Sequence, residues 1–325
     1  MAIAIFLICG ILWPRMKLTA TNRIAPETVP VFLLNEGRGL ERHSFFKLLS
    51  TEDKKFLSAF QKKSPIKDGH NHLVFLPSAR EVILMGLSAR TSYTHRKAIL
   101  AARRVVWFAR REKVKQITVA LEDFTTSDYG RGPHALTELI ATQWTIANFE
   151  FLEYKTPPPD GWMFVHTIEL FTTNTKAAND ALRTGMLIGE EINKSRVLSN
   201  TPGGDMTPVR LAEAAVKAGA ESGFNVSILD EEEIRKLGMG GVLGVSKGSS
   251  ERPQFIVMEY MKGKKTEKPI VLVGKGVTFD TGGLNLKPEH GIYEMHMDMS
   301  GGAAVIHTIA ALARLKVKKN IVGLV

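Results

Sequence analysis

The chain has 325 residues, of which 44% are hydrophobic and 23% are charged. These proportions are typical of a globular protein, and the chain contains no internal repeat, low-complexity tract or collagen-like period. The formal net charge is +10, and most of it lies in residues 1–150, which hold 22 Lys and Arg against 13 Asp and Glu. The length predicts two domains, each large enough to bury a core of its own.

The first residues are apolar but too few to cross a membrane. The apolar run extends from Ala2 to Trp13, whereas a transmembrane helix needs about 20 residues. No basic residue precedes the run and no A-x-A cleavage site follows it, which argues against a secretory signal. We therefore predict that the protein starts at Met16, that residues 1–15 are a mis-assigned extension, and that the protein is not bound to a membrane.

The chain has a single cysteine, Cys9. This excludes an intramolecular disulfide, a C-x-x-C redox site and a cysteine-based zinc site. It is typical of a reducing compartment, and we predict a cytoplasmic location.

Strands and helices alternate in the first half. Apolar runs predict strands over 28–34, 72–77, 81–87 and 116–121, and helical spacing predicts helices over about 93–113 and 135–151. The segment "KTPPPDGW" (155–162) marks a turn or boundary. This order predicts an α/β domain with a largely parallel sheet. The basic stretch 96–115 indicates either a surface for nucleic acid or the solvated face of an amphipathic helix, and the second interpretation is favoured.

The second half is predicted to be α/β as well. The pattern gives strands over 163–171, 224–229, 254–261, 269–274 and 320–325, and helices over 173–200, 208–223, 230–238 and 300–316. Ser300 is the expected N-cap of the last helix. The final strand has no helix after it to cover its apolar surface, so we predict a C-terminally truncated chain.

The candidate metal-binding and catalytic residues lie in one stretch, "GKGVTFDTGGLNLKPEHGIYEMHMDMSGGAA" (274–304). Asp280 and Asp298 are oxygen ligands of the kind that Mg²⁺, Mn²⁺ or Zn²⁺ accepts. Lys275 is able to ligate a metal through a neutral amine, and Lys287 is able to polarise a substrate carbonyl. Each residue alone is more often a cap, a turn residue or a solvated charge. A phosphate loop at "VGKGVT" is a further possibility, although the GxxxxGK[ST] motif is absent.

Together these residues resemble the leucyl aminopeptidase (cytosol aminopeptidase) family of two-metal exopeptidases. The resemblance rests on "GKGVTFDTGG", on the lysine in "LNLKP", on "MHMDMSGGAA" and on "RVLSNTPGGDMTPVRLAEAA" (196–215). It implies that Lys275 and Asp298 bind one metal ion, that Asp280 bridges two, and that Lys287 is the catalytic lysine. It also implies that Met295 lines the pocket for the first side chain of the substrate. His296 is expected to be a packing or solvent-side residue.

The resemblance implies the following organisation and activity. After residues 1–15, a macro-like N-terminal α/β domain spans 16–160, a connecting strand and linker helix span 161–200, and an incomplete peptidase domain spans 201–325. The family uses two divalent ions, Mn²⁺ or Zn²⁺, and their activated hydroxide, to release leucine and similar residues from peptides with a free N-terminus. It also forms homohexamers.

One part of the family pattern is missing. The family has an Asn-Thr-Asp-Ala-Glu-Gly-Arg segment that supplies two more carboxylates and an arginine, and the present sequence has none. We therefore expect this chain not to catalyse hydrolysis. The alternative prediction is an inactive scaffold that binds nucleic acid through Arg103, Arg104, Arg110 and Arg111.

Overall fold

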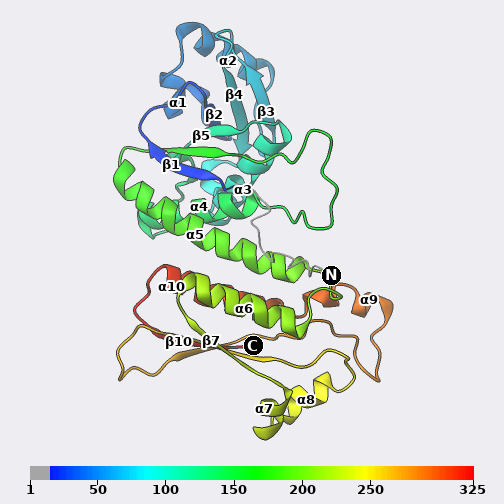
Figure 1. Ribbon diagram of the computed structural model, residues 1–325. Helices are drawn as coiled ribbons and strands as arrows, with labels where there is room; N and C mark the ends of the chain where they lie inside the picture. The colour runs from blue at the N-terminus through cyan, green and yellow to red at the C-terminus, as the bar shows by residue number, and fades with distance from the viewer. Residues whose placement is uncertain (1–14) are drawn as a thin grey trace. The chain divides into compact units, whose positions relative to one another are not determined.

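The computed structural model describes residues 15–325 and divides them into two compact units (Figure 1). The first unit ends at Gly189 and the second starts at Glu190, so the division falls within helix α5 (Thr175–Asn200). Apart from Arg15, the predicted N-terminal extension lies outside the described residues. Within the described residues, no helix is long and apolar enough to span a bilayer.

The N-terminal unit is built on a six-stranded sheet with the order β1-β6-β5-β2-β4-β3. Neighbouring strands are parallel except for the β3–β4 pair, which agrees with the prediction of a largely parallel sheet. The strands are β1 (Lys17–Thr21), β2 (Val29–Asn35), β3 (Asn71–Phe75), β4 (Glu81–Leu87), β5 (Gln116–Ala120) and β6 (Thr167–Phe171). The helices are α1 (Ser44–Lys47), α2 (Thr51–Lys63), α3 (His95–Arg111) and α4 (Gly132–Ala147).

Both faces of this sheet are buried. In β2, Val31 and Leu33 join the core formed with α3 and α4, while Phe32 and Leu34 join the core formed with α1 and α2. Side chains of a strand alternate between faces, so a strand buried on both sides reads as a continuous apolar run. This explains why "VPVFLL" was recognisable as a strand in the sequence.

The C-terminal unit contains a four-stranded mixed sheet with the order β7-β8-β10-β9. The β9–β10 pair is parallel and the other two pairs are antiparallel. The strands are β7 (Asn225–Leu229), β8 (Phe255–Met261), β9 (Ile270–Val273) and β10 (Asn320–Leu324). The helices are α6 (Pro208–Ser222), α7 (Glu231–Lys236), α8 (Gly240–Ser246), α9 (Glu289–Ile292) and α10 (Ser300–Arg314).

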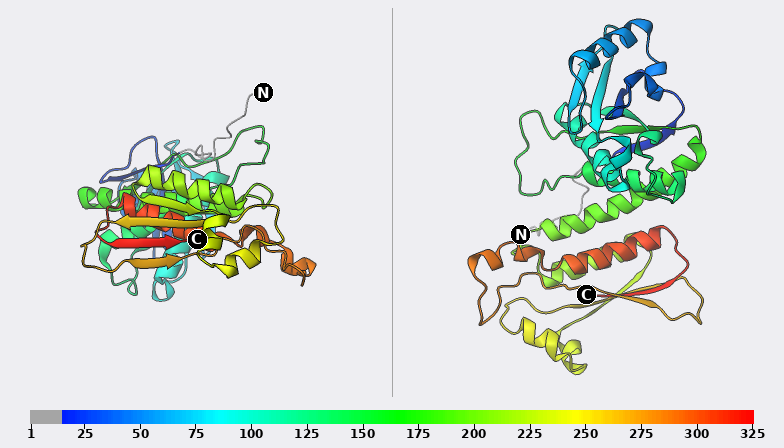
Figure 2. Two further views of the ribbon diagram at one scale, coloured as in Figure 1. Left: turned by 60° about the horizontal axis from the view of Figure 1, so that its bottom comes forward. Right: turned by 180° about the vertical axis from the view of Figure 1, so that it is seen from behind.

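Helices α6 and α10 cover one face of this second sheet (Figure 2). β10, the strand expected to be uncovered, is paired on both sides and lies inside the sheet. The edges of the sheet are β7 and β9, and in β9 the side chains of Ile270, Val271 and Val273 are 54%, 51% and 76% exposed. Apolar surface of this sheet is therefore open to solvent along β9, and also at Met261 of β8, which is 46% exposed.

A buried histidine–aspartate pair joins the loops that follow β2 and β5 in the N-terminal unit. His43 Nε2 lies 3.0 Å from Asp123 Oδ2, and both side chains are almost fully buried. The backbone N–H of Phe45 donates to His43 Nδ1, so Nε2 carries the proton and donates to Asp123. Burial raises the pKa of Asp123, and the electrostatic attraction and hydrogen bond of His43 oppose that rise.

Asp123→Ala is expected to destabilise the N-terminal unit by about 1–3 kcal/mol, because it leaves the buried His43 Nε2–H without an acceptor. Asp123→Asn keeps an acceptor oxygen and should cost less. Glu122→Ala, at the exposed neighbouring position, is the matched control. Urea unfolding followed by circular dichroism measures the three variants. Equal stability of the Asp123→Ala and Glu122→Ala proteins would contradict this role for the pair.

Candidate metal centre

The loop after β9 is packed against the start of α10 by close backbone contact. The N–H of Gly302 donates to the carbonyl oxygen of Lys275 at 2.7 Å. A Cβ at Gly274 would lie 2.5 Å from the Gly301 oxygen and 2.8 Å from the Gly302 Cα, so a larger residue does not fit without backbone movement. This packing places Lys275 beside Asp298, in the turn that precedes α10.

Lys275 and Asp298 form the first of two ion pairs. Lys275 Nζ lies 2.7 Å from Asp298 Oδ2, and the aspartate side chain is 17% exposed. The close carboxylate of Asp298 raises the pKa of Lys275 above its ordinary value, against a smaller opposing effect of burial. Ser300, expected as the N-cap of α10, is instead its first residue, and its hydroxyl donates to the carbonyl oxygen of Met297.

Lys287 and Asp280 form the second ion pair. Their charged atoms, Nζ and Oδ2, lie 2.9 Å apart, and Lys287 Nζ also donates to Met295 Sδ at 3.0 Å. The N–H of Gly282, a residue with φ of 90°, donates to Asp280 Oδ1. The hydrogen bonds from Lys287 and Gly282 lower the pKa of the Asp280 carboxyl, so it is a carboxylate at neutral pH.

Four of the five residues predicted for the site thus form two ion pairs, and the fifth, Met295, contacts Lys287. The two ion pairs also interact with each other, because the Asp280 charge acts on Lys275 as well as on Lys287. Met295 contacts Lys287, a contact that the sequence did not reveal. His296 is half-buried, and none of the hydrogen bonds described for residues 15–325 involves its side chain.

The donor atoms at this site are suitable for a divalent cation. Asp298 Oδ2 is buried and, despite its approach to Lys275, makes no hydrogen bond of good geometry. A buried carboxylate oxygen needs a cation beside it, and here the Lys275 ammonium takes that place at 2.7 Å. Residues 15–325 contain no group of three His, Cys, Asp or Glu side chains arranged for a metal. The donor set here is of another kind, with the carboxylates of Asp280 and Asp298 and the amine of Lys275, which must lose its proton to ligate.

A sequence-distant residue packs against the same loop. A Cβ on Gly203 would lie 2.4 Å from the Phe279 ring, and Phe279 directly precedes Asp280. The turn after α5 therefore supports the position of Asp280. Only the glycines in "TPGGDM" (201–206) hint at this contact in the sequence, and they do not identify the partner.

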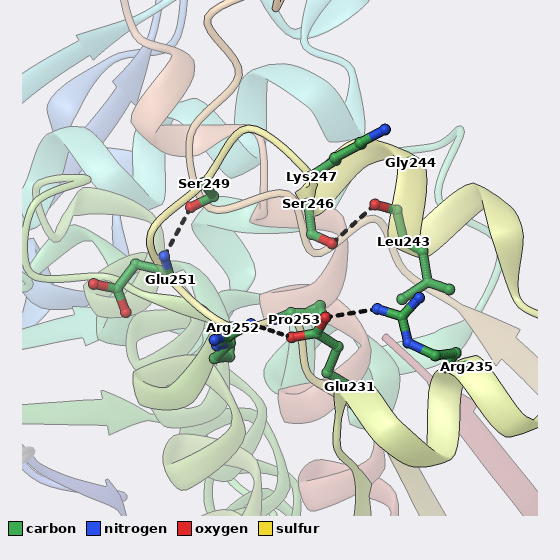
Figure 3. A pocket seen from close by; sticks show the side chains of 10 residues that line it. All are labelled: Glu231, Arg235, Leu243, Gly244, Ser246, Lys247, Ser249, Glu251, Arg252 and Pro253. Carbon is green, nitrogen blue, oxygen red and sulfur yellow. Dashed lines mark hydrogen bonds and ion pairs between the residues drawn. The ribbon is translucent and has the colours of Figure 1, made fainter.

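A separate polar cavity of about 330 Å³ lies where α7 and α8 meet the loop that leads to β8 (Figure 3). Glu231 accepts hydrogen bonds there from Arg235 and Arg252, at 2.9 and 2.7 Å. None of the five predicted site residues lines this cavity. It is therefore not the candidate metal centre.

Residues 193–325 match the catalytic domain of the cytosol aminopeptidase family. A probable cytosol aminopeptidase of Rickettsia typhi is 34% identical over 276 residues, and one of Bdellovibrio bacteriovorus is 33% identical over 309 residues. These alignments cover 82% and 92% of this chain. Residues 193–325 therefore belong to the cytosol aminopeptidase family. The present chain spans 54% and 60% of the lengths of these two relatives.

The family assignment is consistent with the fold. A solved tomato leucine aminopeptidase mutant superimposes with a TM-score of 0.79 at 22% identity, covering 97% of this chain and 63% of that one. The bottromycin maturation enzyme BotP, solved in complex with Mn, gives 0.71 at 22% identity, covering 92% and 59%. At this identity the likeness establishes the α/β fold, as predicted. All five candidate residues lie within the segment that matches the family's catalytic domain.

Proposed function

We propose that this chain carries metal-binding and catalytic residues of a metal-dependent aminopeptidase that releases leucine and similar residues from the N-terminus of peptides. The proposal rests on one observation. The Lys275–Asp298 and Lys287–Asp280 ion pairs form within residues 193–325, the segment that matches the family's catalytic domain. Metal ligands and a cationic group close to one another are what metal-assisted peptide hydrolysis requires.

In this proposal Lys275, Asp280 and Asp298 would hold two divalent ions, Mn²⁺ or Zn²⁺, and Asp280 would be the ligand that serves both. The fold neighbour BotP was solved in complex with Mn, which supports manganese. Bound ions of this type supply Lewis-acid chemistry to a water molecule and a carbonyl group. Lys287, oriented by Asp280 and Met295, would stabilise the negative charge that develops on the carbonyl oxygen during hydrolysis. Met295 contacts the first side chain of the substrate.

The three proposed ligands are too few to hold two ions firmly. Divalent ions of this type take four or more ligands each. We therefore propose that the chain alone binds metal but turns over peptides poorly. By the same family reasoning, a cytoplasmic homohexamer is the proposed state of the assembled enzyme.

Calorimetric titration with Mn²⁺ and a leucyl anilide assay test the proposal. We expect metal binding that is lost in Asp280→Asn and Asp298→Asn and retained in Glu289→Gln, a nearby exposed carboxylate. Absence of Mn²⁺ and Zn²⁺ binding by the unaltered chain would overturn the metal site. Rapid metal-dependent release of leucine would support the aminopeptidase function and contradict the expected poor turnover.

The alternative function, nucleic-acid binding through the arginines of α3, has less support. Arg103 Nε donates to Gln143 Oε1, Arg104 bonds the carbonyl oxygen of Gly86, and Arg110 Nε donates to the carbonyl oxygen of Met163. These three arginines join α3 to its neighbours in the same unit. Their charge is therefore only partly available to a phosphate backbone.

A further inference from the structure

A second cavity, of about 300 Å³, lies at the C-terminal end of α3 in the N-terminal unit. None of its residues belongs to the segment that matches the aminopeptidase family. It is lined by Trp107, Arg110, Arg111, Glu150, Pro158, Gly161, Trp162 and Met163.

Two indole side chains form the apolar part of this cavity. Trp107 is 54% exposed on α3, and Trp162 is half-buried in the loop before β6. Tryptophan carries the largest apolar area of any side chain, and its exposure in a hollow is typical of a binding site. The face of an indole prefers a flat ring or a cation as its neighbour.

The loop that carries Trp162 is held in place before any ligand binds. Gly161, with φ of 72°, closes a turn by donating its N–H to the carbonyl oxygen of Pro158 at 2.8 Å. Lys113 Nζ pairs with Asp160 Oδ2 at 2.8 Å, and Arg110 Nε donates to the Met163 carbonyl oxygen at 2.7 Å. A wall fixed in this way loses little entropy on binding.

The two arginines have different roles. Arg110 is used internally, since it pairs with Glu150 at 2.6 Å and lies over the Phe164 ring. The Arg111 side chain is 67% exposed, one helical turn beyond Trp107. Its Nε donates to Glu112, while its terminal nitrogens have no acceptor among the described residues. Arg111 also lies over a ring, that of Phe108, but its side chain is far more exposed than the 17% of Arg110, so Arg111 is the cation that a ligand can reach.

We propose that this cavity binds a small planar aromatic anion, with its ring against the two indoles and its anionic group on Arg111. The carboxylate of Glu150 lines the cavity, and those of Glu112 and Asp160 belong to residues next to lining residues, so one anionic group is favoured over a chain of phosphates. The volume is at the lower end of the range for small-molecule sites and suits one or two fused rings. This site is independent of the proposed peptidase activity.

Isothermal titration calorimetry with 2-naphthoate, its neutral amide and cyclohexanecarboxylate tests the proposal. We expect 2-naphthoate to bind more tightly than both analogues, which lack the charge or the flat ring. Trp107→Ala and Arg111→Gln are each expected to weaken binding by about tenfold or more. The same titration with adenosine monophosphate shows whether the cavity prefers a nucleotide or an aromatic carboxylate. Tight binding of either compound supports the site.

Leu100→Ala and Lys97→Gln are the matched controls, because both change exposed side chains of α3 that do not line the cavity. Both should bind 2-naphthoate as the unaltered protein does. All four altered residues are exposed or line an open surface, and thermal unfolding checks that each variant is folded. No binding of 2-naphthoate and adenosine monophosphate, equal binding of cyclohexanecarboxylate, or equal binding by Trp107→Ala would each overturn the proposal.

Discussion

Replacement of Glu191 by glutamine is expected to lower the stability of the C-terminal unit by about 3–5 kcal/mol, because it removes the buried carboxylate that pairs with Lys194, His307 and Arg314. The Glu191 side chain is only 2% exposed. Its Oε2 lies 2.8 Å from His307 Nδ1 on α10, and its Oε1 pairs with Lys194 at 3.0 Å and with Arg314. Glu191 thus joins the second part of α5 to α10, the helix that follows Asp298.

Glu190→Gln is the matched control for this change. Glu190 pairs with the same Arg314, at 3.0 Å, but its side chain is 18% exposed and closer to solvent. We expect a clearly smaller loss of stability, since a more exposed pair contributes less. Chemical unfolding monitored by circular dichroism compares the two variants, and equal losses would show that burial of Glu191 is not decisive.

At acid pH, the difference in unfolding free energy between the Glu191→Gln variant and the unaltered protein should disappear. Burial alone raises the pKa of Glu191, but His307 and Lys194 outweigh it and lower the pKa to about 2, from an ordinary value of 4.5. The carboxylate therefore stabilises the fold fully above pH 4.5, and its contribution of about 3 kcal/mol is lost as the pH falls towards 2. A gap in stability that stays constant from pH 6 to pH 3 would contradict this linkage.

Gly274→Ala is expected to disrupt the candidate metal centre. The added methyl group would meet the backbone of Gly301 and Gly302, which is unable to move without displacing the start of α10. Because Lys275 follows Gly274 directly, we expect Mn²⁺ affinity to fall by about tenfold or more, together with a lower melting temperature.

Gly204→Ala controls for the loss of a glycine in the same unit. A Cβ at Gly204 meets no atom within 4 Å, and its φ is not in the left-handed region. Metal affinity and melting temperature should therefore be unchanged. Calorimetry measures the Mn²⁺ affinity of the two variants, and thermal unfolding measures their melting temperatures. Unchanged Mn²⁺ affinity in Gly274→Ala would show that the close approach of Gly274 to the backbone of Gly301 and Gly302 does not position the ligands.

Local pattern was enough to predict every strand of the α/β fold except β1, and the longer helices except α2. Buried strands such as β2 and β4 are continuous apolar runs, and α3 has apolar residues at helical spacing. Helix α2 was missed because its sequence, "TEDKKFLSAFQKK", is mostly polar and buries little. Its signal was the N-cap, where Ser50 accepts a hydrogen bond from the backbone N–H of Asp53. The domain boundaries at residues 160 and 200 stay predictions.

The sequence alone determined which residues compose the candidate site, because the lysines and aspartates lie within 24 positions of one another in a distinctive glycine-rich segment. Only the tertiary structure decided how they pair, with Lys275 on Asp298 and Lys287 on Asp280. It also decided that β10 lies inside a mixed sheet and that Glu191 meets His307, 116 positions away. Such pairings depend on strand order and on the close approach of backbones, which arise from long-range contacts that no local pattern encodes.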